Sequence, residues 1–423
     1  MTKKKWYVVT ALVLGVCLSV QNISVSRADD GTDWFSVWAG DEKVTGASLE
    51  TSDLFIEVGQ TEKVKIVLEP ETASYSSASM QIAPSGVAEA RYVEESGKLY
   101  VCVTGKTVGS SVVTMEVDGF SMTLNITVTG KSVQKHTKAE IRTYLKKHKA
   151  SVNTKVKYKK KPKVKAAYRA GVLSNKTKKA ALRMLNNIRY IAGLNANVTL
   201  NNSYGKKAQA AALVNAVNGV LSHSPSRPTK MKKSLYNLGA SGAGASNISM
   251  GYQNLNAALV YGWMSDGDSY NIDRVGHRRW ILNPLMKQTG FGAVNSYMAM
   301  YALDKKGSGT QTNVYWPAQT MPLEYFGVND PWTVSTGQTL KKSKIKVTLK
   351  RMSDGKTWTF SSKTNKKSKK SGYFNVNNDG YGLIGCVIFR PNKIKYKSGN
   401  KFSVKITGIP TGDIEYQVVF FKL

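Results

Sequence analysis

The first part of the chain alternates apolar and polar residues over short runs. Leu54–Val58 and Val64–Leu68 are two such runs, and Ser96-Gly97 and Asp118-Gly119 supply turns between later ones. Alternation with a period of two predicts β-strands that bury one face. About seven short strands at this spacing are typical of a β-sandwich. We therefore expect residues 49–130 to form an all-β domain.

The middle of the chain has helical spacing. Helices are expected at about 181–192, 203–221 and 255–263, the first of them ended by Gly193. Strand-like runs follow between residues 289 and 316. The residues that share one face of the first helix are Ala181, Leu185, Ile188 and Ala192. Helices followed by a small sheet predict an α+β domain over residues 176–330.

The last part, residues 331–423, alternates again. Ile345–Leu349 and Phe402–Ile406 are examples, and the lysine cluster Lys363–Lys370 is expected in a hairpin loop. The pattern predicts a small all-β C-terminal domain. The fold class is therefore multidomain: an all-β sandwich, an α+β domain, and a small all-β domain.

The N-terminus predicts export. Lys3–Lys5 is a charged segment, Trp6–Val20 is apolar, and Ser26-Arg27-Ala28 is a small-x-small cleavage site. Residues 1–28 are interpreted as a signal peptide, residues 29–48 as an N-terminal lead, and the mature chain is expected to have no transmembrane span. We expect a secreted protein associated with the cell wall or surface of a Gram-positive bacterium.

Charge is unevenly distributed along the chain. The net charge is +34, but residues 29–130 hold 6 Lys/Arg against 16 Asp/Glu, whereas residues 131–423 hold 51 against 11. Residues 131–175 read as a basic linker with a short helix capped by Thr137 and Glu140. The alternative is a tether in which alternating Val, Tyr and Lys lie along a strand edge. Such charge favours anionic cell-wall polymers or anionic lipid as partners, with nucleic acid not expected as the main one.

Two cysteines lie in apolar runs, one in each β-rich part. Cys102 and Cys386 are expected to be buried and unpaired, because they fall in separate parts of the chain.

Only two histidines lie outside the lysine-rich segment. His223 stands in the sequence Leu-Ser-His-Ser-Pro, and His277 in Val-Gly-His-Arg-Arg-Trp. Ser246-Asn247-Ile248 and Trp263-Met264-Ser265-Asp266 lie between them. This order of motifs resembles the CAP superfamily, the SCP-like extracellular domain. Val58–Thr61, Leu68–Pro70 and Leu124–Val128 similarly resemble bacterial Ig-like group 2 domains, for residues 49–130.

The CAP resemblance implies an α-β-α sandwich with a central cleft. It places His223, His277 and Asp266 at positions where CAP proteins carry two histidines and an acid. Ser246 stands where the family has a second acid, and a serine cannot act as a carboxylate ligand or general base. We expect Ser246, Asn247, Trp263 and Arg278 to bind ligand. The alternative for Asn247 is a structural role.

Two imidazoles and one carboxylate form a set that fits a transition metal such as zinc, with His223 and His277 as ligands. The alternative is that both histidines are structural. Three functions remain open: binding of a wall, lipid or host ligand without turnover; metal-assisted hydrolysis of peptide or peptidoglycan by His223, His277 and Asp266; and non-specific polyanion binding. The missing acid at Ser246 favours the first.

Overall fold

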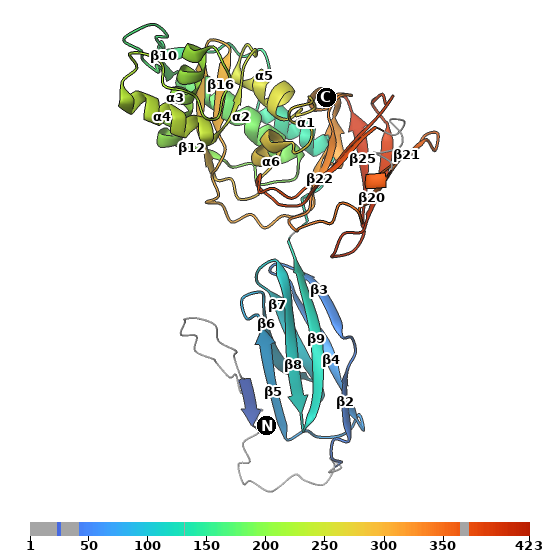
Figure 1. Ribbon diagram of the computed structural model, residues 1–423. Coiled ribbons are helices and arrows are strands. Elements are labelled where there is room, and N and C mark those ends of the chain that lie inside the picture. The colour runs from blue at the N-terminus through green and yellow to red at the C-terminus, as the bar shows by residue number, and fades with distance from the viewer. Residues whose placement is uncertain (1–22, 27–41, 131, 364–371) are drawn as a thin grey trace. The chain divides into compact units, whose positions relative to one another are not determined.

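The chain consists of two compact units, residues 1–130 and 131–423. The computed structural model describes residues 23–26, 42–130, 132–363 and 372–423 (Figure 1). Most of the predicted signal peptide and lead, and nearly all of the Lys363–Lys370 cluster, lie outside the described residues. Among the described residues, no helix is both long and apolar enough to cross a membrane.

The first unit contains two β-sheets. One has the order β1-β5-β8-β9-β3 and the other β2-β4-β7-β6. Its strands are β1 (Ile23–Ser26), β2 (Gly46–Leu49), β3 (Asp53–Glu57), β4 (Thr61–Glu69), β5 (Ser77–Ala83), β6 (Ala88–Glu95), β7 (Lys98–Gly105), β8 (Gly109–Val117) and β9 (Phe120–Thr129). The strand β1 falls within the predicted signal peptide.

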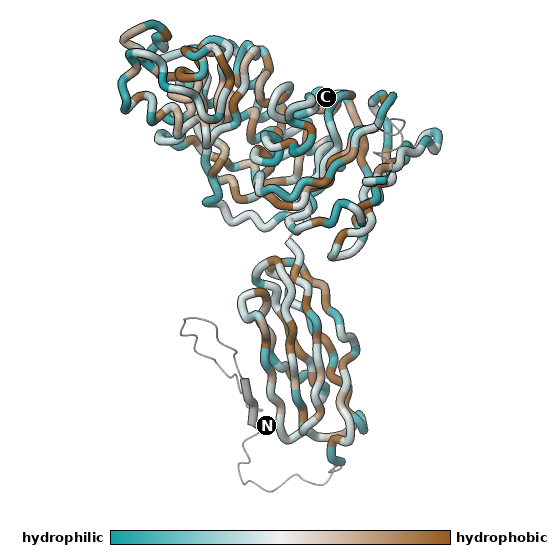
Figure 2. The backbone as a smooth tube through the Cα atoms, viewed as in Figure 1, coloured by the Kyte–Doolittle hydropathy of each residue, from teal (hydrophilic) through white to brown (hydrophobic). Residues whose placement is uncertain are grey.

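Alternation along the strands builds one core from both sheets of this unit. In β8 and β9 every second side chain is buried, and Figure 2 shows the same alternation of hydropathy along the tube. Asp118 and Gly119 both have positive φ, the geometry of a tight hairpin turn. The all-β prediction is confirmed, although β5 was missed because its sequence, SASMQIA, is rich in small and polar residues.

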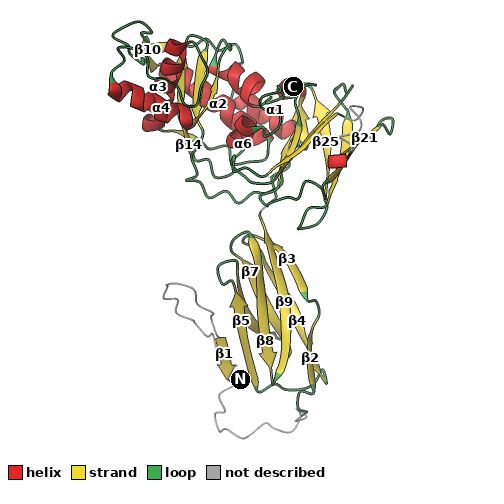
Figure 3. Cartoon of the chain, viewed as in Figure 1, coloured by secondary structure: helices red, strands yellow, loops and turns green. Residues whose placement is uncertain are grey.

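The second unit combines helices with several sheets, and most helices gather on one side of it (Figure 3). The helices are α1 (Lys138–Lys147), α2 (Asn175–Ile191), α3 (Asn202–Asn218), α4 (Lys233–Gly244), α5 (Leu255–Ala257), the π-helix η1 (Ala258–Trp263), α6 (Gly276–Ile281) and the 3₁₀-helix η2 (Leu323–Tyr325). The predicted stripe on the first helix is buried, and Gly193 has a φ of 73°. Both predictions are therefore confirmed.

Small residues bring α3 and α4 together. Ala208 and Ala211 of α3 are fully buried, and a Cβ on Gly242 of α4 would come within 2.1 Å of the Lys207 carbonyl oxygen. Helix α3 ends at Gly219, whose φ of 69° is left-handed, rather than at the proline turn that follows.

Three small strand pairings lie among these helices. Strands β13 (Ser246–Ser249), β16 (Tyr297–Tyr301) and β15 (Phe291–Val294) form an antiparallel sheet. The strands β12 (Thr199–Leu200) and β14 (Gln288–Thr289) pair in parallel, and β10 (Tyr158–Lys160) pairs with β11 (Val172–Leu173).

Two larger sheets complete the second unit. One has the order β17-β19-β23-β22 and the other β18-β25-β24-β20-β21. The strands are β17 (Val314–Trp316), β18 (Thr320–Pro322), β19 (Trp332–Ser335), β20 (Lys346–Arg351), β21 (Thr357–Ser361), β22 (Gly372–Asn377), β23 (Cys386–Pro391), β24 (Lys401–Thr407) and β25 (Ile414–Phe421). Because β17 and β18 belong to the segment 176–330, strand pairing crosses the expected boundary at residue 330.

The largest hydrophobic core cluster of the second unit joins the parts that the sequence separates. It runs from Ile141 in α1 through Trp263 to Phe421 in the last strand. The segment 132–175 therefore differs from the expected solvated linker: Ile141 is fully buried, and Val156 and Tyr158 pack against the core. The burial of these apolar residues was not predicted, because they lie in a segment whose composition is dominated by lysine. The capping box of Thr137 and Glu140 is present as predicted, and Cys102 and Cys386 are buried and unpaired as predicted.

Candidate functional site

His223 lies in the loop after α3, with an exposed side chain. Its Nδ1 is 2.8 Å from the carbonyl oxygen of Ala243, near the end of α4. Since a carbonyl only accepts, Nδ1 carries a proton and donates in this contact. The Nε2 atom is then the nitrogen left to meet a ligand.

His277 is held by Asp266. Its Nδ1 donates to Asp266 Oδ1 across 2.7 Å, and the other carboxylate oxygen accepts the backbone N–H of Arg278 at 3.1 Å. The Asp266 side chain is 1% exposed and that of His277 is 19% exposed. The carboxylate therefore orients the ring, so that Nε2 is again the free nitrogen.

The pair also changes how readily His277 takes a proton. Burial favours the neutral ring, but the charge of Asp266 and its hydrogen bond outweigh burial, so the pKa of His277 is raised above its ordinary value. A larger fraction of His277 is therefore cationic near neutral pH than of an ordinary histidine.

Both histidines line one cavity of about 320 Å³. The lining comes from the α4–β13 junction, the loop before α6, α6 itself, the residues after β16 and a loop of the C-terminal strands. The residues are His223, Gly244, Ala245, Ser246, Asn247, Asn271, Arg274, Gly276, His277, Trp280, Ala302, Leu303 and Tyr381. The structure thus brings His223, His277, Ser246 and Asn247 together in one lining, with Asp266 bonded to His277.

Ser246 and Asn247 begin strand β13 and have different roles. Ser246 is 5% exposed, and its Oγ has no hydrogen-bond partner among the described residues. Asn247 donates from Nδ2 to the His277 carbonyl oxygen at 2.9 Å, which is the structural role considered for it. A buried hydroxyl without a partner in the wall of a cavity is free to bond a ligand or water.

Trp263 and Arg278, both expected to bind ligand, do not line the cavity. Trp263 is 1% exposed and donates from Nε1 to the Ile248 carbonyl. Arg278 is fully buried and donates to the carbonyls of Met264, Ser265 and Pro331. Both predictions require correction, because these side chains hold the interior together. Arg279, the next residue, is likewise buried.

Sequence reasoning missed the aromatic and cationic part of the lining. Trp280 lies one turn after His277, and Arg274 lies just before α6. Tyr381 comes from the C-terminal β-region, more than 100 residues away. The spacing of Trp280 from His277 was a usable signal, but no local pattern could have revealed Tyr381.

Buried Arg279 holds Tyr381 in place. Its guanidinium donates to Asn377 Oδ1, to the Asp379 carbonyl and to the Leu383 carbonyl, and lies 5.4 Å from the Tyr381 ring centre. The C-terminal β-region is therefore part of this cavity.

Two residues near His277 have left-handed backbone conformations that are unfavourable for their residue types. Val275, a β-branched residue, has a φ of 46°, and Asp266 has a φ of 44°. Such conformations cost on the order of 1–3 kcal/mol and persist only where packing enforces them. Val275 is fully buried against Cys386 and Ile388 of β23. The C-terminal sheet thus enforces the geometry that places His277 beside Asp266.

The residues present do not complete a tetrahedral metal site. Among the described residues, no group of three or more His, Cys, Asp or Glu side chains is placed to hold a metal ion. Asp266 is already bonded to His277 and the Arg278 N–H, and Ser246 is neutral. Catalytic zinc sites use three protein ligands, and this cavity offers two imidazoles.

Comparison with known families matches residues 182–316 to the family described as "CAP: Cysteine-rich secretory protein family". Both cavity histidines lie within this segment, and the match supports its place in the CAP superfamily. The comparison with curated proteins found no match.

Solved structures show only distant likeness. Domains 4 and 5 of the S-layer protein SbsC share 13% identity, covering 20% of this chain and 51% of that chain, with a TM-score of 0.18. The M1 domain of titin shares 15% identity, covering 21% and 96%, with a TM-score of 0.14. A Bacteroides ovatus GH5 xyloglucanase shares 15% identity, covering 56% and 51%, with a TM-score of 0.19. The chain spans about half the length of the first of these structures.

Proposed function

We propose that this is an exported, surface-associated protein whose second unit binds an extracellular ligand in the cavity of His223 and His277 without turning it over. The observation that carries the proposal is the arrangement of the two imidazoles. Each has Nδ1 held by an internal acceptor, and both line the same cavity. In this proposal residues 49–130 are an Ig-like spacer in front of the binding unit.

The lining favours a ligand with both polar and flat apolar parts. Trp280 and Tyr381 offer aromatic surface, while Ser246, Arg274 and His277 offer hydrogen bonds and positive charge. Sugars, carboxylates and phosphates of wall, lipid or host molecules share this chemistry. The net charge of residues 131–423 adds a long-range attraction for anions.

Binding without turnover is supported because, among the described residues, the cavity does not pair the His277 base with a bonded nucleophile. The His277–Asp266 pair has the geometry of a base with its orienting carboxylate. A nucleophile would have to bond that base, and Ser246 Oγ has no bonded partner. The Asp266 carboxylate is engaged twice, so it supports His277 rather than acting on substrate.

The alternative is a hydrolase in which His277, oriented by Asp266, activates a water held near His223. The 2.7 Å contact between His277 and Asp266 specifically favours this candidate. It requires the ligand to bring its scissile bond to the free Nε2 atoms.

One experiment separates the two functions. Soluble peptidoglycan fragments and phosphatidylglycerol vesicles are titrated against the full chain while tryptophan fluorescence is followed, and the same mixtures are analysed by mass spectrometry for products. Binding that weakens at least about tenfold in His277→Ala, with no product, supports the proposal. Products lost in His277→Ala establish the hydrolase instead, and binding unchanged by both His223→Ala and His277→Ala removes the cavity from either function.

A further inference from the structure

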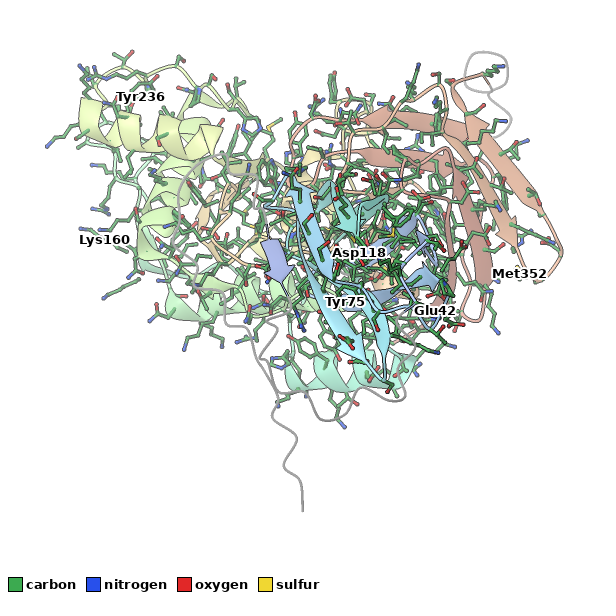
Figure 4. All side chains as sticks on the ribbon, turned by 90° about the horizontal axis from the view of Figure 1, so that it is seen from below. Glu42, Tyr75, Asp118, Lys160, Tyr236 and Met352 are labelled. Atoms are coloured by element: carbon green, nitrogen blue, oxygen red, sulfur yellow. The ribbon has the colours of Figure 1, made fainter. Side chains whose placement is uncertain are left out.

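Residues 155–163 form a row of lysines on the surface of the second unit. Lys155, Lys157, Lys159, Lys160, Lys161 and Lys163 are all exposed, whereas Val156, Tyr158 and Pro162 between them are half-buried. We call residues 155–163 the lysine ribbon. Around the labelled Lys160 in Figure 4, several side chains that end in nitrogen point away from the molecule.

The backbone of the lysine ribbon is fixed to the folded unit at several points. The N–H of Lys157 donates to Thr177 Oγ1 at 2.9 Å, and the Lys157 carbonyl accepts from Ser174 and Thr177. The Tyr158 hydroxyl donates to the Ala293 carbonyl at 3.1 Å. The positive charges are therefore held in place before any partner arrives, which lowers the entropy cost of binding.

The far end of the ribbon is also anchored. Lys163 and Arg169 exchange two backbone hydrogen bonds, of 2.8 and 3.1 Å. Gly171 lies so close that a Cβ on it would be 2.6 Å from the Lys160 carbonyl oxygen. The ribbon thus follows one path along the surface.

The charges of the ribbon are not neutralised by the protein itself. Among the described residues, no ion pair involves any of its lysines. Like charges held side by side repel one another, and a bound anion relieves that repulsion. A polymeric anion that binds the ribbon would therefore replace the small counterions around its lysines.

A groove of about 650 Å³ runs beside the ribbon. Lys155, Val156, Tyr158, Lys161 and Pro162 of the ribbon line one part of it. The remaining lining residues are Asn153, Gln253, Asn254 and Asn295. Asn153, Gln253 and Asn295 are exposed, and their amides can bond uncharged oxygens of a ligand, whereas the amide of Asn254 is bonded to Val152 and Ala257. This groove is distinct from the cavity of His223 and His277, since the two share no lining residue.

We propose that the lysine ribbon and its groove bind a linear anionic polymer that carries phosphate or carboxylate groups along its backbone. A chain rises at most about 3.3–3.6 Å per residue, so the stretch from Lys155 to Lys163 spans no more than about 26–29 Å. A polymer lying along the ribbon meets its lysines one after another. The site goes beyond the proposed cavity function and does not depend on it.

The geometry distinguishes this partner from a membrane and from nucleic acid. A lipid surface is bound more tightly when apolar side chains insert into it, but Val156 and Tyr158 are half-buried and pack against the protein core. Single-stranded nucleic acid is held by bases stacking on exposed aromatic rings, and Tyr158, the only aromatic residue of the ribbon, is half-buried.

The test compares two variants with equal loss of charge. The ribbon variant carries Lys→Gln at the five odd-numbered positions Lys155, Lys157, Lys159, Lys161 and Lys163. The control variant carries Lys→Gln at the exposed positions Lys344, Lys346, Lys350, Lys397 and Lys401. Circular dichroism and the thermal midpoint show whether each variant is folded.

Binding of fluorescent poly(glycerol phosphate) and of poly-L-glutamate is measured by anisotropy at several salt concentrations. For five contacts, we expect log K of the wild type to fall with log salt at a slope of about −3 to −4. The ribbon variant should bind at least about tenfold more weakly, with a slope nearer zero, while the control stays within about twofold. The two polymers distinguish phosphate from carboxylate as the preferred group.

Equal losses in the two variants, or no loss in the ribbon variant, would overturn the proposal. Ribbon-dependent binding of single-stranded DNA or of phosphatidylglycerol vesicles, without binding of either polymer, would overturn the class of partner. His277→Ala should leave polymer binding unchanged, so failure of the cavity function and failure of the ribbon can be told apart.

Discussion

The Nδ1 of His277 donates a hydrogen bond of 2.7 Å to the Oδ1 of Asp266, and this contact joins two segments that fold against different parts of the protein. Asp266 follows the π-helix η1, whereas His277 lies in α6, whose preceding residue Val275 packs against the C-terminal sheet. The contact therefore depends on how Val275 packs against β23.

We predict that Asp266→Asn lowers the pKa of His277, because the charge that favours the imidazolium is lost. A hydrogen bond to a charged group contributes about 1.5–3 kcal/mol, so the variant should be destabilised by about this amount at low pH. NMR titration of the imidazole and denaturant unfolding at about pH 5.5 and about pH 8.5 measure the two effects.

The sign of the pH dependence follows from the raised pKa of His277. The stabilisation from its charged form is complete below the unfolded value of about 6.5 and is lost as pH rises through the folded value. The stability difference between wild type and Asp266→Asn should thus shrink towards alkaline pH. A difference that grows with pH would mean that the pair is not charged in the folded state.

Ile141 and Tyr381 show which features of the structure local sequence patterns do not predict. Periodicity located most strands of residues 49–130 and the helical stripe of Ala181 and Leu185, and short motifs located both cavity histidines, because these signals are local. Ile141 stands among lysines, and Tyr381 belongs to a different β-region of the sequence. Neither the burial of Ile141 nor the place of Tyr381 in the cavity follows from local spacing, since both depend on contacts between distant segments.

A chain ending at Asp330 should fail to form a cooperative second unit. The deletion removes core residues such as Trp332 and Phe420, the partners of β17 and β18, and the Pro331 carbonyl that accepts from Arg278. Far-UV circular dichroism and thermal unfolding of the truncated and full chains provide the comparison. A cooperative transition of residues 131–330 in the truncated chain would show that this part is an independent domain.

Gly276→Ala should disturb the cavity through Tyr381. A Cβ at Gly276 would lie 3.0 Å from two atoms of the Tyr381 ring, so the ring has to move. We expect overpacking to lower the free energy of unfolding by about 1–3 kcal/mol and to weaken ligand binding. Denaturant unfolding measures the first effect and tryptophan fluorescence during ligand titration the second.

Two further variants identify the cause of this effect. Gly205→Ala, where a Cβ meets nothing within 4 Å, is the matched control and should leave binding unchanged. Adding Tyr381→Ala to Gly276→Ala should restore much of the stability, because the ring that is overpacked is gone. No recovery in the double variant would place the strain elsewhere than at Tyr381.

The last prediction concerns zinc. Two imidazoles with free Nε2 atoms can hold a divalent ion loosely, but the raised pKa of His277 makes protons compete for one of them. We therefore expect weak binding by calorimetry at about pH 7.5, with loss of binding at about pH 5.5. His223→Ala and His277→Ala should each weaken it by at least about tenfold, since each removes one of two ligands.

His148→Ala is the matched control, because His148 stacks on Tyr144 away from the cavity. Equal zinc affinity in the wild type and both cavity variants would show that the two histidines do not share an ion, and tight binding retained at the lower pH would mean that other residues supply the ligands.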